Sequence, residues 1–466
     1  MTYWLVRAKW GMVNKKAEFI SNDEWINGYD DKYLDIVNRV EIDDILLLAE
    51  DSTITHYGVC NENEKNGRHL IVDKWMLLKA PILFPAKGAY IKTIVKVNDE
   101  SLIEEITLEI EKTRISNDIK IKQIVIENFT VFNSENLGFS DGLNVVVGEN
   151  GGGKSHLLKL LYSLLIVIDH IAHSKYPKKI FPGGDSVISE VINMFLMEIF
   201  KPDELDNLIS HNKDKCSINI NLGKTSILFD LIRPNKVHID EQKHPPTIFF
   251  KKSNVFIPAK EMLSFYEGFI ALYENRETSF DKIYYNLARS LSLPVLKNIE
   301  SYPVENKLLS RFEDILGGKI VLERGRFYLV SNNGHKTEIA LIAEGLRKIA
   351  TIAQLIANGS LNKNSILFWD EPEANLNPRL IKKVAEVLVE LSRAGMQIFI
   401  ATHSLFLVKE LEILRNKEDK INYFSFGFDG QDIRVSQSED FEYLDDIVIL
   451  DEELEQSDRF LSKKED

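Results

Sequence analysis

Eight consecutive residues carry the clearest chemical signal in this chain. They read Gly-Glu-Asn-Gly-Gly-Gly-Lys-Ser and occupy positions 148–155. The spacing is that of a loop that binds nucleotide phosphates, because its glycines let backbone N–H groups point at phosphate oxygens. The Lys154 ammonium can reach the β- and γ-phosphates of ATP, and the Ser155 hydroxyl is a ligand for Mg²⁺. The predicted contacts to the ATP phosphates come from Gly148, Glu149, Asn150, Gly151, Gly152, Gly153, Lys154 and Ser155.

Two acids and a histidine lie far downstream, each after an apolar run. Asp370 and Glu371 follow residues 366–369, and His403 follows residues 397–401. An aspartate at such a place can hold Mg²⁺, and the adjacent glutamate can polarise the attacking water. The histidine can sense the γ-phosphate. We therefore predict Glu371 and His403 as catalytic residues, and Asp370 with Ser155 as the metal ligands.

The segments around these residues alternate between strand and helix patterns. A β-rich run precedes the glycine loop and a helix-prone run follows it. After the acids, Asn377 can cap a helix that starts with Pro378 and ends before Gly395. Strand, short helix and strand imply a right-handed crossover and parallel neighbours. The acids and the histidine are then expected at one edge of a parallel sheet, in a protein of the α/β class.

The order of these patterns predicts several regions. Residues 1–97 are β-rich, and residues 98–118 have the apolar periodicity of a linker helix. The nucleotide domain is expected at 119–430 and contains an inserted β and helical lobe at 185–345, since a compact domain does not need so much chain between Lys154 and Asp370. Residues 431–466 form an acidic tail. A solvated tail is favoured over an interaction motif.

Bulk composition narrows the setting of the protein. The chain has 466 residues and a formal net charge of −14, which gives no footprint for non-specific nucleic-acid binding. Its two cysteines, Cys60 and Cys216, have no zinc-site spacing and indicate a reduced compartment. The first residues lack a signal-peptide pattern, and no apolar run is long enough to cross a bilayer. We expect a cytoplasmic protein that makes no membrane contact.

The ordered motifs resemble the ABC-type heads of SMC-like, RecF-like and OLD-like proteins, within the AAA-family ATPases. The resemblance lies in residues 148–155, 370–378 and 402–404, and it covers roughly residues 120–425. It implies an ABC-type P-loop ATPase head with an inserted helical lobe. It also implies that two heads close on ATP, so that the protein is a homodimer or a higher oligomer that hydrolyses ATP slowly.

The resemblance extends to a signature loop at residues 342–348. In the family this loop touches the γ-phosphate bound by the other subunit, which implies that Ala343, Glu344 and Gly345 contact ATP. The chain departs from the transporter pattern, because Ala343 replaces a serine and Glu344 replaces the first glycine. Glu-Gly-Leu-Arg versions resemble those of OLD-like and defence-related ATPases. Asn377 stands where the family has an aspartate that makes a second contact between subunits.

The N-terminal region resembles the PUA-like, EVE-type domains of modification-dependent restriction systems. The resemblance lies in Trp4–Val6, Ala8–Gly11, Trp25, Gly28–Asp30 and Val40–Leu48. It implies a small β-rich barrel that holds a flipped modified base of a nucleic acid between aromatic walls. The candidate walls are Trp10, Trp25 and Tyr29. The alternative, that these aromatic side chains form the barrel core, stays open.

Together these inferences give one preferred function and two alternatives. We expect an ATP-gated sensor or regulator of an anti-phage defence system that acts with a separate effector protein, since no second catalytic centre is visible in the sequence. The first alternative is a RecF-like or SMC-like DNA repair ATPase. The second is a nearly inactive, nucleotide-bound scaffold that restrains a toxin.

Overall fold

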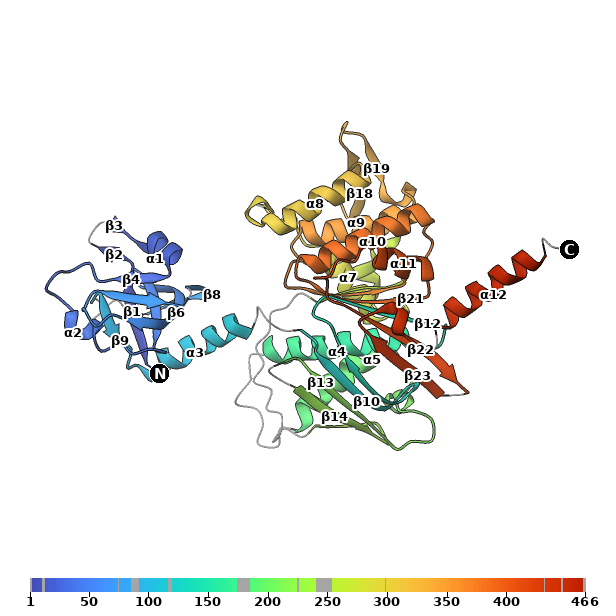
Figure 1. Cartoon of the computed structure of the whole chain (residues 1–466), viewed down its shortest axis with the longest axis horizontal. Helices are drawn as coiled ribbons and strands as arrows, with labels where there is room; N and C mark the ends of the chain where they lie inside the picture. Colours follow the sequence, from blue (N-terminus) through green and yellow to red (C-terminus); the bar gives the residue numbers. More distant parts are fainter. Residues whose placement is uncertain are drawn as a thin grey trace. The chain divides into compact units, whose positions relative to one another are not determined.

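In the computed structural model the chain forms two compact units. They comprise Met1–Asp118 and Ile119–Asp466 (Figure 1). The structure describes residues 2–10, 13–73, 75–84, 92–115, 120–173, 185–223, 226–239, 254–297, 299–430, 432–445 and 447–463. Among these residues, no helix is both long enough and apolar enough to cross a membrane.

The first unit is built on a seven-stranded sheet of mainly antiparallel strands. The strand order is β4-β7-β6-β5-β1-β9, and β8 pairs with β6. The strands are β1 (Tyr3–Arg7), β4 (Glu24–Ile26), β5 (Ile45–Glu50), β6 (Thr53–Asn63), β7 (His69–Val72), β8 (Met76–Leu83) and β9 (Ile94–Lys96), with β2 (Lys9–Trp10), β3 (Val13–Asn14), α1 (Lys16–Asn22) and α2 (Leu34–Val37) beside them. In the described residues the end strands β4 and β9 do not pair, so the sheet is open and the expected closed barrel is not confirmed.

The expected helix after this sheet is present as α3 (Glu100–Ile115). Its apolar residues Leu102, Ile106 and Ile110 are buried in a core cluster of the first unit. Burial of one face explains why the apolar spacing persists through a highly charged segment. The helix is therefore packed as part of the first unit and is not a free linker.

The second unit contains a six-stranded sheet in the order β16-β20-β21-β12-β22-β23. All neighbours are parallel except β22 and β23. The strands are β12 (Leu143–Gly148), β16 (Asn254–Ile257), β20 (Ile366–Asp370), β21 (Gln397–Thr402), β22 (Ile421–Asp429) and β23 (Asp432–Ser438). The expected α/β class and the parallel pairing of the strands at 366–370 and 397–402 are confirmed.

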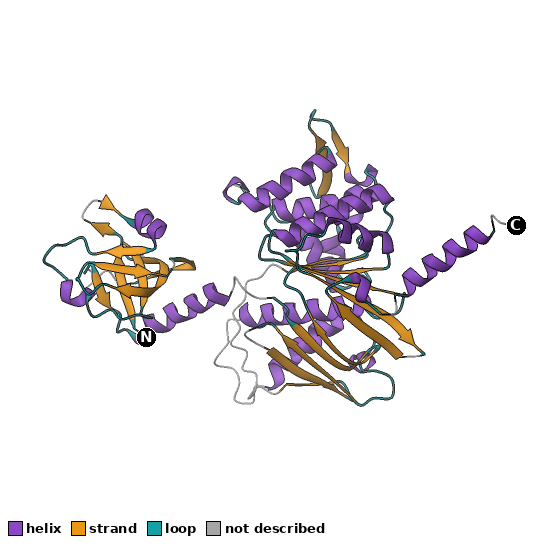
Figure 2. Cartoon of the chain, viewed as in Figure 1, coloured by secondary structure: helices purple, strands orange, loops and turns teal. Residues whose placement is uncertain are grey.

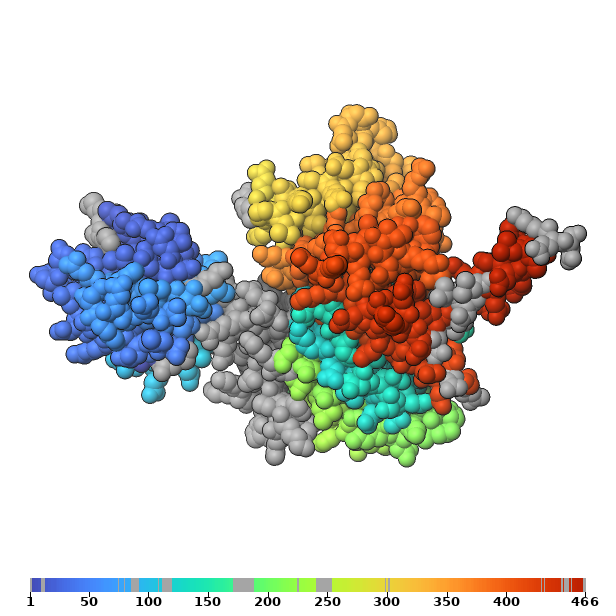
Figure 3. Space-filling view, viewed as in Figure 1, coloured from blue at the N-terminus to red at the C-terminus, as the bar shows by residue number. Residues whose placement is uncertain are grey.

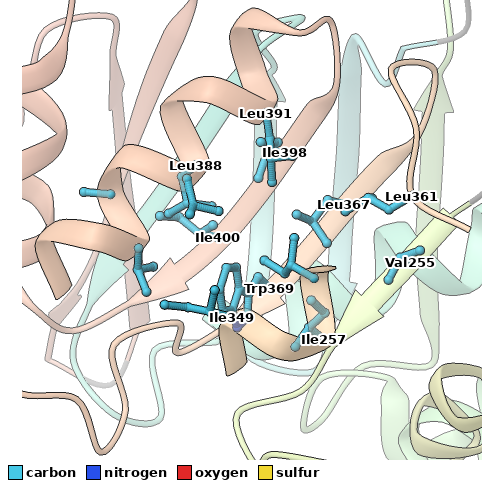
Figure 4. Close-up of a cluster of buried hydrophobic side chains, with 14 of the residues drawn as sticks. Val255, Ile257, Ile349, Leu361, Leu367, Trp369, Leu388, Leu391, Ile398 and Ile400 are labelled. Atoms are coloured by element: carbon cyan, nitrogen blue, oxygen red, sulfur yellow. The ribbon is translucent and has the colours of Figure 1, made fainter. Parts of the chain in front are cut away.

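Helices cover both faces of this sheet (Figure 2). On one face, Trp369 and Ile400 meet side chains of α9 (Glu344–Ala357) and α10 (Pro378–Arg393), as Figure 4 shows. On the other face, Phe368 contacts Tyr162 of α4 (Lys154–His173). Burial on both faces accounts for the continuous apolar runs of the central strands.

A second, antiparallel sheet and a helical lobe complete this unit. The sheet has the order β11-β10-β13-β14-β15, formed by β10 (Gln123–Phe129), β11 (Phe132–Gly138), β13 (Lys215–Asn221), β14 (Ser226–Ile232) and β15 (Lys236–Ile239). Helix α5 (Asp185–Phe200) packs between α4 and β15. The lobe contains α6 (Phe269–Glu274), α7 (Lys282–Leu291) and α8 (Pro303–Leu316). It also carries a three-stranded sheet, which was not predicted, with β17 (Gly318–Glu323), β18 (Arg326–Ser331) and β19 (Lys336–Glu338). The lobe protrudes at the top of the view in Figure 3.

The prediction of an acidic tail from residue 431 needs correction. Strand β23 pairs along its whole length with β22, and Phe441, Leu444 and Ile447 are buried in the core. The acidic composition led to the wrong prediction because the apolar residues of this segment are widely spaced among polar ones. Only helix α12 (Val448–Ser462) fits the description of an exposed tail.

The burial of α3 gives a test of the first unit. We expect Ile106→Ala to lower the free energy of unfolding of this unit by about 2–4 kcal/mol, because it removes a side chain with no exposed surface. The matched control is Glu104→Ala, which changes an exposed residue of the same helix. Urea unfolding followed by tryptophan fluorescence reports chiefly on this unit, since it holds four of the five tryptophans. Equal midpoints for both variants would contradict the packing of α3.

Candidate nucleotide site

The glycine loop connects β12 to α4, as the sequence predicts. Strand β12 is buried between β21 and β22, and α4 begins at Lys154, so the loop amides lie at a helix N-terminus. Gly153 has a φ of +85°, and a Cβ there would lie 2.7 Å from Val131 Cγ2. A larger residue would therefore be strained and would collide with the β10–β11 turn. The arrangement suits an anion, since unpaired N–H groups and the helix dipole both favour negative charge.

Lys154 is held inside this loop with 7% of its surface exposed. Its ammonium donates hydrogen bonds to the carbonyl oxygens of Gly148, at 2.8 Å, and of Glu149, at 2.7 Å. Burial lowers the pKa of Lys154, while nearby carboxylates led by Asp370 oppose the shift. The ammonium of Lys154 is thus held next to the loop amides. A cation beside backbone N–H groups is the arrangement that binding of a polyphosphate requires.

Ser155 and Asp370 meet although they are 215 positions apart in the chain. The Ser155 hydroxyl donates to Asp370 Oδ1 at 3.1 Å. Burial raises the pKa of Asp370, the hydrogen bond from Ser155 opposes this, and the charge of Glu371 adds to it. Both side chains offer hard oxygen atoms, so the pair fits Mg²⁺ better than a softer metal.

Glu371 follows Asp370 in a backbone conformation that is unusual for its residue type. Its φ is +46°, in the left-handed region. Three hydrogen bonds hold its backbone there. Its N–H donates to the Ala401 carbonyl at 2.9 Å, and its own carbonyl accepts from Lys348 Nζ at 3.0 Å and from the Ala374 N–H at 3.1 Å. Lys348 lies on α9 with 1% of its surface exposed, and burial lowers its pKa. Such strain is characteristic of sites where a side chain must be aimed.

His403 lies at the end of β21, beside the acids at the end of β20. Its Nδ1 is 3.7 Å from Glu371 Oε1 and 3.5 Å from Glu373 Oε1. The structure therefore brings together the predicted Asp370, Glu371 and His403. Glu373 was not predicted as a site residue, although the sequence held a signal, since it is the third acid within four residues.

The predicted signature segment forms the first turn of α9. Ala343 is the N-cap residue and Glu344 is the first helical residue. A Cβ on Gly345 would lie 2.5 Å from Leu376 Cδ2 and 2.7 Å from Leu380 Cδ1, so a larger residue would force these two leucine side chains to move. Asn375 Nδ2 donates to Glu344 Oε1 at 3.0 Å. The segment is thus attached to the loop that follows the acids.

The predicted aromatic pocket of the first unit is not assembled as expected. Trp25 has no exposed surface, and its indole Nε1 donates to the Arg7 carbonyl at 3.0 Å, so it is a core residue. Tyr29 is 39% exposed and its ring meets Tyr33 edge-on, with centroids 5.6 Å apart. The side chain of Trp10 lies outside the described residues. The core alternative therefore holds for Trp25, and Tyr29 is the exposed one of the two aromatic side chains that the structure describes.

The parallel sheet, the glycine loop and the acids at one sheet edge define a P-loop ATPase of the AAA/ABC type. Residues 143–409 match the family described as "AAA domain, putative AbiEii toxin, Type IV TA system". The match covers more than half of the chain, and the chain belongs to this family.

Individual proteins match over shorter stretches. Old nuclease of Escherichia phage P2 is 37% identical over 75 residues, which are 16% of this chain and 13% of the nuclease. The arginine transport ATP-binding protein ArtM of Bacillus subtilis (strain 168) is 30% identical over 123 residues, 25% of this chain and 45% of ArtM. The chain thus spans less than half the length of either protein.

Solved structures of SMC heads also match. One is the SmcHead bound to the C-winged helix domain of ScpA, with 14% identity, a TM-score of 0.43 and coverage of 68% of this chain and 97% of that chain. Another is the SMC head domain from Thermotoga maritima, with 14% identity, a TM-score of 0.37 and coverage of 68% and 99%.

The enclosed ammonium of Lys154 leads to a direct binding test. We expect Lys154→Met to weaken ATP binding by about 30-fold to 1,000-fold, because it removes a buried charge that pairs with phosphate. Calorimetry with ATP measures the effect. Lys417→Met, which changes an exposed lysine outside the nucleotide site, is the control and should bind like the wild type. Equal affinity of Lys154→Met and wild type would remove the loop from the nucleotide site.

Proposed function

We propose that this protein is an ATP-gated switch that hydrolyses ATP slowly, and that Glu371 activates the attacking water. One observation carries the proposal: Glu371 and His403 lie at the sheet edge where Ser155 contacts Asp370 and where the glycine loop begins α4. A carboxylate next to a phosphate site can accept a proton from water as the bond to the γ-phosphate forms.

The donor set at this edge supports a requirement for Mg²⁺. Ser155 Oγ and Asp370 Oδ1, 3.1 Å apart, are the atoms that would hold the ion. When bound, Mg²⁺ would neutralise charge on the phosphate oxygens.

Side chains of the protein would bind the phosphates and orient the attacking water. Lys154 would exchange its two bonds to loop carbonyls for bonds to phosphate, so that charge pairs with charge. Glu371, held at its backbone by Lys348, would keep its carboxylate directed at the water. His403 would contact the γ-phosphate from the neighbouring strand. Catalysis is then positioning and charge stabilisation, with no covalent intermediate.

We further propose that two copies close on ATP through the signature residues Ala343, Glu344 and Gly345. Leu341, two residues before Ala343, is 76% exposed and would lie at the edge of such a contact.

We place the switch in anti-phage defence with a separate effector, and the match to a phage nuclease and the description of the family support this setting. The absence of zinc-site spacing between Cys60 and Cys216 supports the proposed reduced, cytoplasmic setting. The first unit would act as the PUA-like sensor of a nucleic acid.

Glu371→Gln tests the switch. We expect the rate of ATP hydrolysis to fall about 100-fold to 10,000-fold, because the amide cannot accept the proton. ATP affinity should stay within about threefold of wild type, since the binding loop is unchanged. Light scattering should show a dimer that persists with Mg-ATP.

The control is Glu442→Gln, which changes an exposed acid near the C-terminus and should behave like wild type. Wild-type turnover by Glu371→Gln would remove Glu371 as the base. ATP-dependent retention on DNA without any effector would favour the repair alternative. A stoichiometric protein partner combined with negligible hydrolysis by the wild type would favour the scaffold.

Tyr29 offers a test of the sensor role. Its ring is exposed, and Lys32 Nζ lies 5.8 Å from the ring centroid, so a base could stack beside a cation. We expect Tyr29→Ala to weaken binding of single-stranded oligonucleotides by about fivefold to 100-fold, as for loss of one stacking contact. Fluorescence anisotropy measures this, with exposed Tyr443→Ala in the second unit as the control. Unchanged affinity would exclude Tyr29 as a base contact.

A further inference from the structure

Glu373 is a buried acid that neither the motif analysis nor the proposed mechanism uses. It lies two residues after Glu371 and has 5% of its surface exposed. A single carboxylate oxygen, Oε1, accepts two hydrogen bonds from the end of β21: one from Thr402 Oγ1 at 2.6 Å and one from the His403 backbone N–H at 3.1 Å. The acid therefore joins the loop after β20 to the turn after β21.

These bonds fix the whole turn that carries His403. Thr402 Oγ1, which donates to Glu373, also accepts from the Ser404 backbone N–H at 3.0 Å. Ser404 in turn caps α11 (Leu405–Leu414) through a bond from the Leu407 N–H at 3.2 Å. The backbone on both sides of His403 is thus set by one carboxylate, either directly or through Thr402.

The imidazole of His403 lies within reach of two carboxylates. Its Nδ1 is 3.5 Å from Glu373 Oε1 and 3.7 Å from Glu371 Oε1. Side-chain exposure differs sharply between the two acids, at 4% for Glu373 and 34% for Glu371. The enclosed acid can hold the ring, while the open acid remains free for a water molecule.

Burial of a carboxylate here is costly, so a specific role is needed to explain it. Removing a charged group from water costs several kcal/mol unless hydrogen bonds and opposite charge compensate it. An amide would pack in the same volume without that cost. An amide oxygen could accept the same two bonds but carries no charge. The charge of Glu373 opposes the lowering of the pKa of buried Lys348, whose ammonium donates to the Glu371 carbonyl, so the charge is the property that a carboxylate adds at this site.

We propose that Glu373 is a positioning residue for ATP hydrolysis, which fixes His403 relative to Glu371 and the γ-phosphate. The proposal rests on the function proposed above. It implies that Glu373 affects turnover and leaves ATP affinity nearly unchanged, because its hydrogen bonds go to the turn after β21, and Asp370 and Glu371 act on Lys154 more strongly than Glu373 does.

The test uses Glu373→Gln in the full chain. We expect kcat to fall about 10-fold to 100-fold with KM and ATP affinity within about twofold of wild type, as for an interaction that matters only in the transition state. The matched control is Glu305→Gln on α8. Glu305 is also 5% exposed and accepts a backbone N–H, from Lys363 at 3.1 Å, but it lies outside the site. It should leave kcat unchanged.

A double-mutant cycle tests whether Glu373 affects kcat through His403 or through the stability of the site as a whole. In a His403→Ala background, Glu373→Gln should change kcat less than about twofold, because the residue that it positions is gone. Equal losses of kcat in both backgrounds would overturn the proposal, since Glu373 would then act independently of His403.

A crystal structure of Glu373→Ala, which removes the oxygen that accepts from Thr402 Oγ1 and the His403 N–H, gives a readout that does not depend on hydrolysis. We expect the turn at residues 402–404 to move and the His403 ring to leave its place beside residue 373. An unmoved turn and ring would overturn the proposal even if the protein hydrolyses ATP. Conversely, absence of hydrolysis by the wild type would overturn the proposed function and leave the turn geometry as a separate result.

Discussion

The parallel pairing of β21 with both β12 and β20 is the constraint on which the site depends. In this register Val147 lies opposite Thr402, and Asp370 lies opposite Ala401. The three strands therefore end together, and the side chains just beyond them must share one edge of the sheet. Strand β21 is buried over all six residues, so apolar burial holds the two halves of the site in place. The long insertion between them costs little more than a short one, since loop-closure entropy grows only with the logarithm of length.

The same edge holds several buried charged side chains close together. Lys154, Lys348 and Glu373 are each less than a tenth exposed, and Asp370 lies beside them. Each cation donates to carbonyl oxygens of the loops that it holds, and each anion accepts from a hydroxyl or N–H group. These hydrogen bonds and the nearby opposite charges offset the cost of burial, although among the described residues Glu373 Oε2 has no hydrogen-bond partner. Apolar residues of equal volume would stabilise the fold at least as well. The charges are therefore better explained by chemistry than by stability.

Local sequence patterns predicted the residues of the nucleotide site better than they predicted which other residues are buried or paired. The glycine loop, the apolar strands before Asp370 and His403, and the helix capped by Asn377 follow from residue types and short-range spacing. Other features depend on which distant segment covers a residue. Trp25 and Tyr29 are both aromatic, yet only contacts across the sheet decide that the first is buried and the second exposed. In the same way, β23 is polar in composition and is a strand because β22 pairs with it. The role of Glu373 became visible only with the Thr402 hydroxyl in place.

The first turn of α9 shows how the site could respond to a second copy. Gly345 packs on Leu376, and Lys348 one turn later holds the carbonyl of Glu371, so the signature segment and the proposed base are parts of one connected structure. A contact made on that turn would reach Glu371 through one buried side chain. Glu344 changes the charge at such a contact. Its carboxylate lies at the N-terminus of α9, the positive end of the helix dipole, where a glycine would leave the backbone N–H groups accessible. A phosphate brought there by a partner would meet this charge. If two heads close as proposed, the contact would therefore be weaker than with a glycine at 344, and a weaker contact would suit the proposed switch because the heads must separate again.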